Sequence, residues 1–451
     1  MTLKAVIVAD DLTGALDTGT PFVEAGLSVA VAVDVGAAED AIATGCDVVV
    51  VNTASRALGE PEAAERVRFA TAALRGVKPA VVMKKIDSRL KGNVAAESLA
   101  LADALGLEAI LVAPAIPDQE RVTYRGCVVG RGVDKPLPIS DLVEITIVLR
   151  IGNSNIARAA LEQIGDRQWL VDAAADNTAS IGHALLIGNS RRHQDSLQAD
   201  ALGLEAILVA PAIPDQERVT YRGCVVGRGV DKPLPISDLF EGRTGNVAVA
   251  DAEDDSDLDQ IVADHDWRLT LAVGARGLGA ALARQLGETG RQSVPEFAAT
   301  RRTLFAFGSR DPITATQMDR LEASGVLRMV MDAPIGEIEG GEGMALPALL
   351  RCTGDMAVDT ALVARRFAAG VRSVIDDTRP DMLMVGGGDT ALAVFQALGV
   401  RVLAPKGEIE AGVPWFDVTA ADGRHFRCAV KSGGFGNPDS LLRLVLWNRA
   451  A

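Results

Sequence analysis

Short apolar runs of strand length alternate along this chain with segments of helical periodicity. Continuous apolar runs are typical of parallel strands, because helices cover both faces of a parallel sheet. The alternation therefore predicts βαβ units that form a doubly wound, mainly parallel sheet. The predicted strands of this first sheet are residues 6–9, 29–33, 48–52, 81–84 and 110–113.

The same alternation extends over the rest of the chain. Further strands are predicted at 247–251 and 269–273, separated by an acidic helix at 254–264. A polar stretch with Pro295 predicts a linker at 291–302, and an apolar run at 303–307 then opens a second α/β set. The predicted fold class is α/β with two domains, 1–290 and 303–451, each a mainly parallel sheet flanked by helices.

One segment occurs twice without a single change. Residues 102–142 recur as residues 199–239, at an offset of 97. Natural repeats diverge because each copy packs against different neighbours, and two identical strands cannot fill one position in a sheet. We therefore expect one copy to be surplus to the core, although the sequence does not reveal which copy is native. The residues between the copies contain a strand-like run at 145–149 and a helical pattern at 156–164.

Composition excludes several classes of function. The formal net charge of −15 disfavours nucleic acid or an anionic membrane as a partner, because both are bound through clustered Lys and Arg. Five dispersed cysteines and four isolated histidines lack zinc-type spacing. No long apolar segment is present, which predicts a cytoplasmic protein. Acid–base chemistry is therefore expected to use a carboxylate.

Two adjacent acids, Asp10 and Asp11, follow the first predicted strand, and Thr13-Gly14 then opens a helical pattern. In open α/β sheets, ligands bind at the carboxyl ends of the strands. Adjacent carboxylates repel each other unless they are solvated, bonded or neutralised. The pair therefore predicts a site that meets a hydroxyl group or a metal ion, with a solvated helix cap as the alternative.

Two further loops place cations after predicted strands. Residues 84–91 hold four Lys and Arg side chains in an otherwise acidic chain, and Arg56 follows the strand at 48–52. Arg offers a two-pronged donor to a carboxylate, and Lys offers a point charge. The combination fits an acidic substrate or a phosphoryl group in transfer, whereas a solvated loop is the alternative.

Three glycine-containing loops follow strands in the second predicted domain, at 308–314, 386–391 and 431–436. Glycines let backbone N–H groups approach phosphate oxygens at a helix N-terminus. The loop at 386–391 also matches the dinucleotide fingerprint G-x-G-x-x-A, which leaves an NAD(P)-dependent oxidoreductase open. The Walker A pattern is absent.

Taken together, residues 9–15, 84–88, 386–391 and 431–436 resemble, in this order, the motifs of the four-carbon acid sugar kinase family. The resemblance implies an N-terminal sugar-acid-binding domain and a C-terminal nucleotide-binding domain, with the active site in the cleft between them. It implies transfer of the γ-phosphoryl group of ATP to the terminal hydroxyl of threonate, erythronate or 3-oxo-tetronate, with Mg²⁺ as cofactor.

The resemblance also implies roles for individual residues. Asp10 or Asp11 would deprotonate the acceptor hydroxyl, while Lys85 and Mg²⁺ offset the charge of the phosphoryl group together with Arg89. The implied sugar-acid contacts are Arg56, Asp87, Ser88 and Arg89. The implied ATP contacts are Ser309, Gly386, Gly387, Gly388, Asp389, Gly433 and Gly434.

Two departures from the family pattern lie at residues 89–93 and 274–279. They leave open an altered substrate, or a sugar-acid-binding protein that has lost catalysis. A homo-oligomer is also open, and the residues that bind the metal are unknown.

Overall fold

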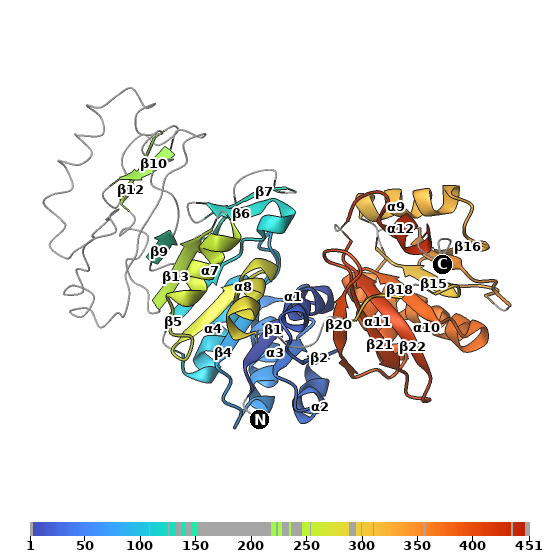
Figure 1. Cartoon of the computed structure of the whole chain (residues 1–451), viewed down its shortest axis with the longest axis horizontal. Coiled ribbons are helices and arrows are strands. Elements are labelled where there is room, and N and C mark those ends of the chain that lie inside the picture. The colour runs from blue at the N-terminus through green and yellow to red at the C-terminus, as the bar shows by residue number, and fades with distance from the viewer. Residues whose placement is uncertain are drawn as a thin grey trace, which may run out of the picture. The chain divides into compact units, whose positions relative to one another are not determined.

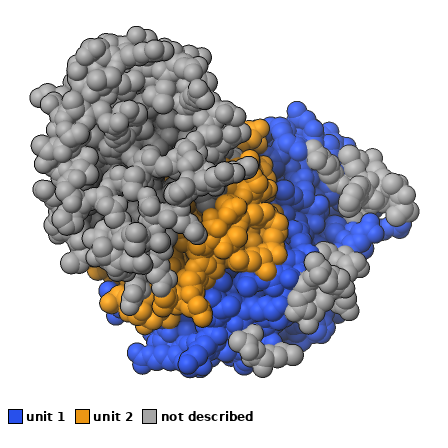
Figure 2. Space-filling model, turned by 60° about the vertical axis from the view of Figure 1, so that its left-hand side comes forward, with its two compact units in different colours: residues 1–58, 65–85, 286–451 blue, residues 59–64, 86–285 orange. Residues whose placement is uncertain are grey.

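A computed structural model of the chain places the predicted strands in two main sheets (Figure 1). Two compact units are distinguished: residues 1–58, 65–85 and 286–451 form unit 1, and residues 59–64 and 86–285 form unit 2 (Figure 2). The described residues are 3–107, 109–124, 127–131, 133, 137–139, 147–150, 218–221, 224–227, 234–235, 246–252, 254–287, 295–298, 300–309, 311–341, 343–354, 358–433 and 436–446.

The first sheet of unit 1 contains four parallel strands, and every residue of these strands is buried. Its strand order is β19-β2-β3-β1-β4. The first four strands in chain order are β1 (Ala5–Ala9), β2 (Val29–Ala32), β3 (Val48–Asn52) and β4 (Val81–Lys85). The helices of this region are α1 (Leu12–Glu24), the short 3-10 helix η1 (Val35–Ala37), α2 (Ala38–Ala43) and α3 (Glu60–Ala73).

The edge strand of that sheet comes from the C-terminal part of the chain. β19 (Val402–Leu403) pairs antiparallel with β2, and Val402 lies opposite Ala32. The side chain of Arg401, the residue before β19, donates to the carboxylate of Asp40 and to the carbonyl of Gly36. The C-terminal part of unit 1 is thus bonded to the N-terminal sheet at this edge.

The second sheet of unit 1 has the strand order β16-β17-β15-β18-β22-β21-β20 and is parallel from β16 to β22. Its strands are β15 (Thr303–Phe307), β16 (Met329–Pro334), β17 (Ala348–Thr353), β18 (Met382–Gly386), β20 (Pro405–Glu408), β21 (Pro414–Thr419) and β22 (His425–Lys431). Its helices are α9 (Pro312–Ala323), α10 (Thr360–Thr378), α11 (Gly388–Ala397) and α12 (Ser440–Leu446). Both sheets confirm the predicted α/β class with mainly parallel strands.

In unit 2, four parallel strands are adjacent in one sheet, in the order β14-β5-β13-β9. Its strands are β5 (Ala109–Ala113), β9 (Ile147–Arg150), β13 (Asn246–Asp251) and β14 (Thr270–Gly274). Its helices are α4 (Val94–Leu105), the 3-10 helix η2 (Pro117–Gln119), α7 (Asp255–Ala263) and α8 (Arg276–Leu286). The strands predicted at 110–113, 247–251 and 269–273 are thereby confirmed within one or two residues.

The two identical segments form the same small sheet twice. β6 (Arg121–Tyr124), β7 (Cys127–Gly130) and β8 (Leu137–Pro138) pair antiparallel, as do β10 (Arg218–Tyr221), β11 (Cys224–Gly227) and β12 (Leu234–Pro235). The strand β5 of the first copy occupies a position in the unit 2 sheet. The matching strand of the second copy and the predicted helix at 156–164 lie outside the described residues.

The domain boundary at 291–302 stays a prediction. Phe297, which lies in that stretch, packs against Trp415, and the guanidinium of Arg427 lies over both rings. Among the described helices, none is long and apolar enough to cross a membrane.

Gly386 provides the first test of this packing. A β-carbon at this position would lie 1.9 Å from a ring carbon of Phe307, so Gly386→Ala forces a buried aromatic ring to move. We expect the free energy of unfolding to fall by about 1–3 kcal/mol, as for other overpacked cores. Urea denaturation measures this change in the free energy of unfolding. Gly59→Ala is the control, because its nearest contact would be an ordinary 4.0 Å, and an equal effect of both changes would contradict the packing.

A deletion tests the duplicated segment. Removing residues 143–239 takes 97 residues from the 451 and leaves a chain of 354. Removing 102–198 produces the identical chain, so one variant tests the loss of either copy. Since β5 and β13 are both kept and pair directly, we expect this variant to fold, with only the edge strand β9 lost from the sheet. Circular dichroism during heating shows whether the variant is folded, and the absence of a cooperative unfolding transition would contradict the expectation.

Candidate active site

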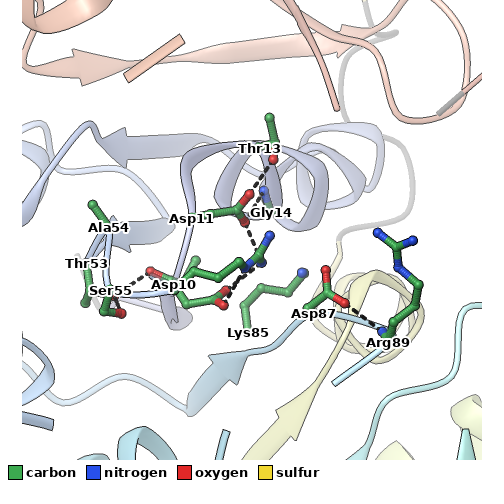
Figure 3. A network of polar contacts seen from close by, with 12 residues as sticks. Asp10, Asp11, Thr13, Gly14, Thr53, Ala54, Ser55, Lys85, Asp87 and Arg89 are labelled. Carbon is green, nitrogen blue, oxygen red and sulfur yellow. Dashed lines mark hydrogen bonds and ion pairs between the residues drawn. The ribbon is translucent and has the colours of Figure 1, made fainter. Parts of the chain in front are cut away.

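Asp11 begins helix α1 and holds its first turn. Its backbone is extended, and its carboxylate accepts hydrogen bonds from the backbone N–H of Gly14 at 2.9 Å and from the hydroxyl of Thr13 at 2.5 Å (Figure 3). These bonds satisfy donors that every helix N-terminus leaves open. Thus Asp11 does cap the helix, as the alternative interpretation of the sequence held, but it also has charged partners.

Arg56 joins the two adjacent acids. Its Nε and one terminal nitrogen donate to the two carboxylate oxygens of Asp10, at 2.8 and 2.9 Å, and the same terminal nitrogen donates to Asp11 at 2.9 Å. This two-pronged geometry is the strongest form of an Arg–carboxylate pair. The guanidinium therefore neutralises the repulsion that the sequence Asp-Asp creates.

Asp10 is almost completely buried, with 3% of its surface exposed. Burial opposes ionisation of its carboxyl group, but Arg56, Lys84 and Lys85 outweigh burial, so the pKa of Asp10 is lowered. The carbonyl of Asp10 also accepts the backbone N–H groups of Ser55 and Arg56. The β1–α1 loop and the loop after β3 are thus joined through backbone and side chains.

Lys84 and Lys85, at the end of β4, are both buried. Lys84 Nζ donates to the carbonyl of Lys85 at 2.7 Å. Lys85 Nζ lies beside the first turn of α1, because a β-carbon at Gly14 would be only 3.0 Å from it. The structure therefore brings Asp10, Asp11, Arg56 and Lys85 together at the carboxyl ends of three neighbouring strands.

The glycine turn before α11 lies at the corresponding edge of the second sheet. Gly387 has a φ of +102°, which favours glycine, and it precedes the helix without a side-chain cap. The N–H of Gly387 donates to the carbonyl of Lys431 at 2.9 Å. The next N–H groups begin a helix, so the turn has the backbone geometry of an anion-binding site.

The three glycine loops predicted from the sequence do converge, because β15, β18 and β22 are adjacent strands. A β-carbon at Gly387 would lie 3.4 Å from the β-carbon of Ser309, and one at Gly433 would lie 2.6 Å from its hydroxyl. Gly308 leaves room for Thr390, whose hydroxyl would be 2.1 Å from a β-carbon there. Gly434 lies outside the described residues.

The acidic loop and the glycine turn face each other within unit 1. A β-carbon at Gly388 would lie 3.2 Å from Oδ2 of Asp11 and 3.3 Å from the hydroxyl of Thr13. Burial raises the pKa of Asp389, and the charge of Asp11 raises it further, while Arg56 lowers it. Helix α1 packs against β20 (Figure 1) and also against α11, which holds the two loops in place.

Asp87, Ser88 and Arg89 belong to unit 2. The carboxylate of Asp87 accepts the backbone N–H of Arg89 at 2.8 Å (Figure 3). The hydroxyl of Ser88 accepts a hydrogen bond from Arg121, whose other terminal nitrogen donates to Gln119. The predicted roles of these three residues in binding the sugar acid stay predictions.

Several residues that shape the site lie in the predicted loops but had no individual role predicted from the sequence. Thr13 belongs to the predicted motif after the first strand, and a hydroxyl beside a capping Asp is a recognisable signal. Thr314, Thr390 and Lys431 give no such signal, because their contacts join residues far apart in the chain. Within the described part of the chain, no three His, Cys, Asp or Glu side chains are grouped as metal ligands.

Two family descriptions match the chain. The sugar-binding N-terminal domain matches residues 5–174, and the nucleotide-binding C-terminal domain matches residues 348–441. The first match contains the acidic loop, and the second contains the glycine turns at Gly387 and Gly433.

Known proteins are similar along nearly the whole chain. A D-threonate kinase of Cupriavidus necator is 30% identical, over 97% of this chain and 96% of the relative. A 3-oxo-tetronate kinase of Methylobacterium radiotolerans is 28% identical, over 97% and 98%. A solved structure from Salmonella typhimurium LT2 has the same fold, with a TM-score of 0.61 at 18% identity over 99% of each chain. By its two domain matches and its full-length similarity, the chain belongs to the four-carbon acid sugar kinase family.

Proposed function

We propose that this protein transfers the γ-phosphoryl group of ATP to a hydroxyl group of a four-carbon sugar acid. The observation that carries the proposal is the approach of Asp11 to the glycine turn at Gly388. The first residue lies in the sugar-binding match and the second in the nucleotide-binding match. Phosphoryl transfer requires a donor phosphate and an acceptor hydroxyl in line, so these two loops are where the reactants would meet.

The nucleotide would be bound at the N-terminus of α11. Its first backbone N–H groups and the positive end of the helix dipole favour phosphate oxygens. Ser309, Gly387 and Gly433 line the convergent loops and would approach the phosphates. The remaining predicted ATP contacts, Gly386, Gly388, Asp389 and Gly434, belong to the same loops.

The sugar acid would be bound at the cationic end of the first sheet. Lys85 and Arg56 supply positive charge beside the two acids, and Asp87, Ser88 and Arg89 follow directly in the chain. The substrate class is a four-carbon acid such as threonate, erythronate or 3-oxo-tetronate. A small acid with several hydroxyls matches a site that contains both carboxylates and cations.

Asp11 is the better placed of the two acids to act as general base. Both carboxylate oxygens of Asp10 are bonded to Arg56. In Asp11, both Arg56 and the N–H of Gly14 donate to Oδ1, whereas Oδ2 accepts the hydroxyl of Thr13 and lies on the side of Gly388. We therefore assign deprotonation of the acceptor hydroxyl to Asp11. Asp10 is assigned the role of holding the side chain of Arg56 in position.

The residues present fit a magnesium ion. Mg²⁺ in phosphoryl-transfer sites is bound by one or two carboxylates together with the substrate phosphates. Asp11 and Asp389 are close enough that the charge of the first raises the pKa of the second, which favours a cation near both. Asp389, together with the phosphates, would hold the ion, which would offset the charge of the transferred phosphoryl group and leave Asp11 as the base.

A screen of ATP consumption tests the function. Purified protein with MgATP is expected to consume ATP with at least one of D-threonate, L-threonate, D-erythronate, L-erythronate and a 3-oxo-tetronate, and not without acid. Titration with ATP and with NADH separates the kinase from an oxidoreductase that uses residues 386–391. Binding of an acid without ATP consumption would instead identify a sugar-acid-binding protein that lacks catalysis.

Substitution of the acids tests the mechanism. Loss of a general base lowers turnover by about 100-fold or more, so Asp11→Asn is expected to have this effect. Asp10→Asn is expected to lower turnover by about tenfold, because Arg56 loses its anchoring carboxylate. Asp103→Asn, at an exposed position on α4, is the control. If neither Asp10→Asn nor Asp11→Asn lowers the turnover number by about tenfold, neither acid is the base.

A further inference from the structure

Lys431 is a buried ammonium surrounded by oxygen atoms of the glycine loop. It ends β22, and only 1% of its surface is exposed. Its Nζ donates to the carbonyl of Ser432 at 2.9 Å, to the carbonyl of Gly433 at 3.1 Å and to the hydroxyl of Thr314 at 3.1 Å. An ammonium has three N–H donors. Since all three have protein acceptors, Lys431 is not arranged as a direct phosphate ligand.

Thr314 closes this arrangement from helix α9. Its hydroxyl accepts from Lys431 and donates to the carbonyl of Gly433 at 2.8 Å. The carbonyl of Gly433 thus accepts two hydrogen bonds, one from each side chain. Buried polar groups that are fully bonded to each other hold a single local conformation.

The direction of the carbonyl groups fixes the direction of the N–H groups. A trans peptide is planar, so its C=O and N–H point to opposite sides. Because the carbonyl of Ser432 points toward the ammonium of Lys431, the N–H of Gly433 points away from it. The α-carbon of Gly433 faces Ser309, where a β-carbon would be 2.6 Å from the hydroxyl.

We infer that Lys431, together with Thr314, is a positioning residue that turns the Gly433 peptide so that its N–H faces the nucleotide phosphates. The inference rests on the proposed kinase function, because it assigns the ligand of this loop. It differs from the usual role of a lysine beside a phosphate loop, which is direct contact with the phosphate. Here the ammonium of Lys431 binds the carbonyl groups of the loop, and the N–H of Gly433 binds the phosphate.

The charge of Lys431 is sensitive to pH near neutrality. Burial lowers its pKa to about 8, although Asp311 and Glu410 favour the charged form. Asp311 precedes α9, and Thr314 faces the ammonium from that helix. Below this pKa the ammonium has three donors. Above it the neutral amine has two, so one of its three acceptors, the two carbonyls and the Thr314 hydroxyl, loses its hydrogen bond, and nucleotide affinity should fall.

Direct binding of a non-hydrolysable ATP analogue with Mg²⁺, measured by calorimetry at pH 7, tests the inference without turnover. Lys431→Met keeps the length of the side chain and removes its donors, so affinity is expected to fall about tenfold or more, and Thr314→Val about threefold or more. Affinity for the sugar acid is expected to stay within about twofold. Lys406→Met, at a half-buried lysine of β20, is the control. If Lys431→Met shows no cooperative unfolding in a thermal melt, the nucleotide affinity of Thr314→Val tests the inference instead.

A pH series separates positioning from mere packing. Between pH 7 and 9.5, the analogue should bind progressively more weakly to the unchanged protein above about pH 8. In Lys431→Arg the guanidinium stays protonated, so this alkaline decline should be absent. Equal affinities of the unchanged protein, Thr314→Val and folded Lys431→Met would overturn the inference and leave the kinase function intact. If the unchanged protein binds no nucleotide at all, both are wrong.

Discussion

The bonds from Arg56 to Asp10 and Asp11 are the interaction on which the site depends. Two adjacent carboxylates at the end of a buried strand would repel each other and resist burial. A single guanidinium in contact with both allows Asp10 to stay ionised at 3% exposure and leaves Asp11 able to cap α1. The lysines at the end of β4 add to the same effect. The strand ends of the first sheet are therefore organised around charge rather than apolar packing.

Glycines determine how closely the second sheet approaches this charged group. At Gly388 any side chain would start 3.2 Å from an oxygen of Asp11, and at Gly386 it would meet the ring of Phe307. A side chain at Gly386 would displace the ring of Phe307, and one at Gly388 would require a small shift of Asp11 or Thr13. The glycines thus let the backbone of the turn approach the side chains of Asp11 and Phe307, and no side chain of its own covers the first residue of α11.

Much of this arrangement follows from local sequence. Buried parallel strands gave continuous apolar runs, and the acids and glycine loops follow those strands, so the sheets and the loops could be predicted. β19 could not, because two residues that pair with a strand about 370 positions earlier leave no periodic signal. Lys431 could not either, since burial of a lysine depends on acceptors supplied by α9 and by the loop itself.

The charges of the described site favour joint binding of nucleotide and metal. The end of a helix offers about half a positive charge, which does not balance the carboxylate of Asp389 at the start of α11, whereas Asp11 is already paired with Arg56. A polyphosphate alone would therefore meet repulsion at this turn. A divalent cation held by Asp389 would remove this repulsion, and Arg56 prevents Asp10 from adding to the negative charge. In the proposed reaction the site would thus accept the nucleotide as its metal complex, with Asp11 beside the acceptor hydroxyl.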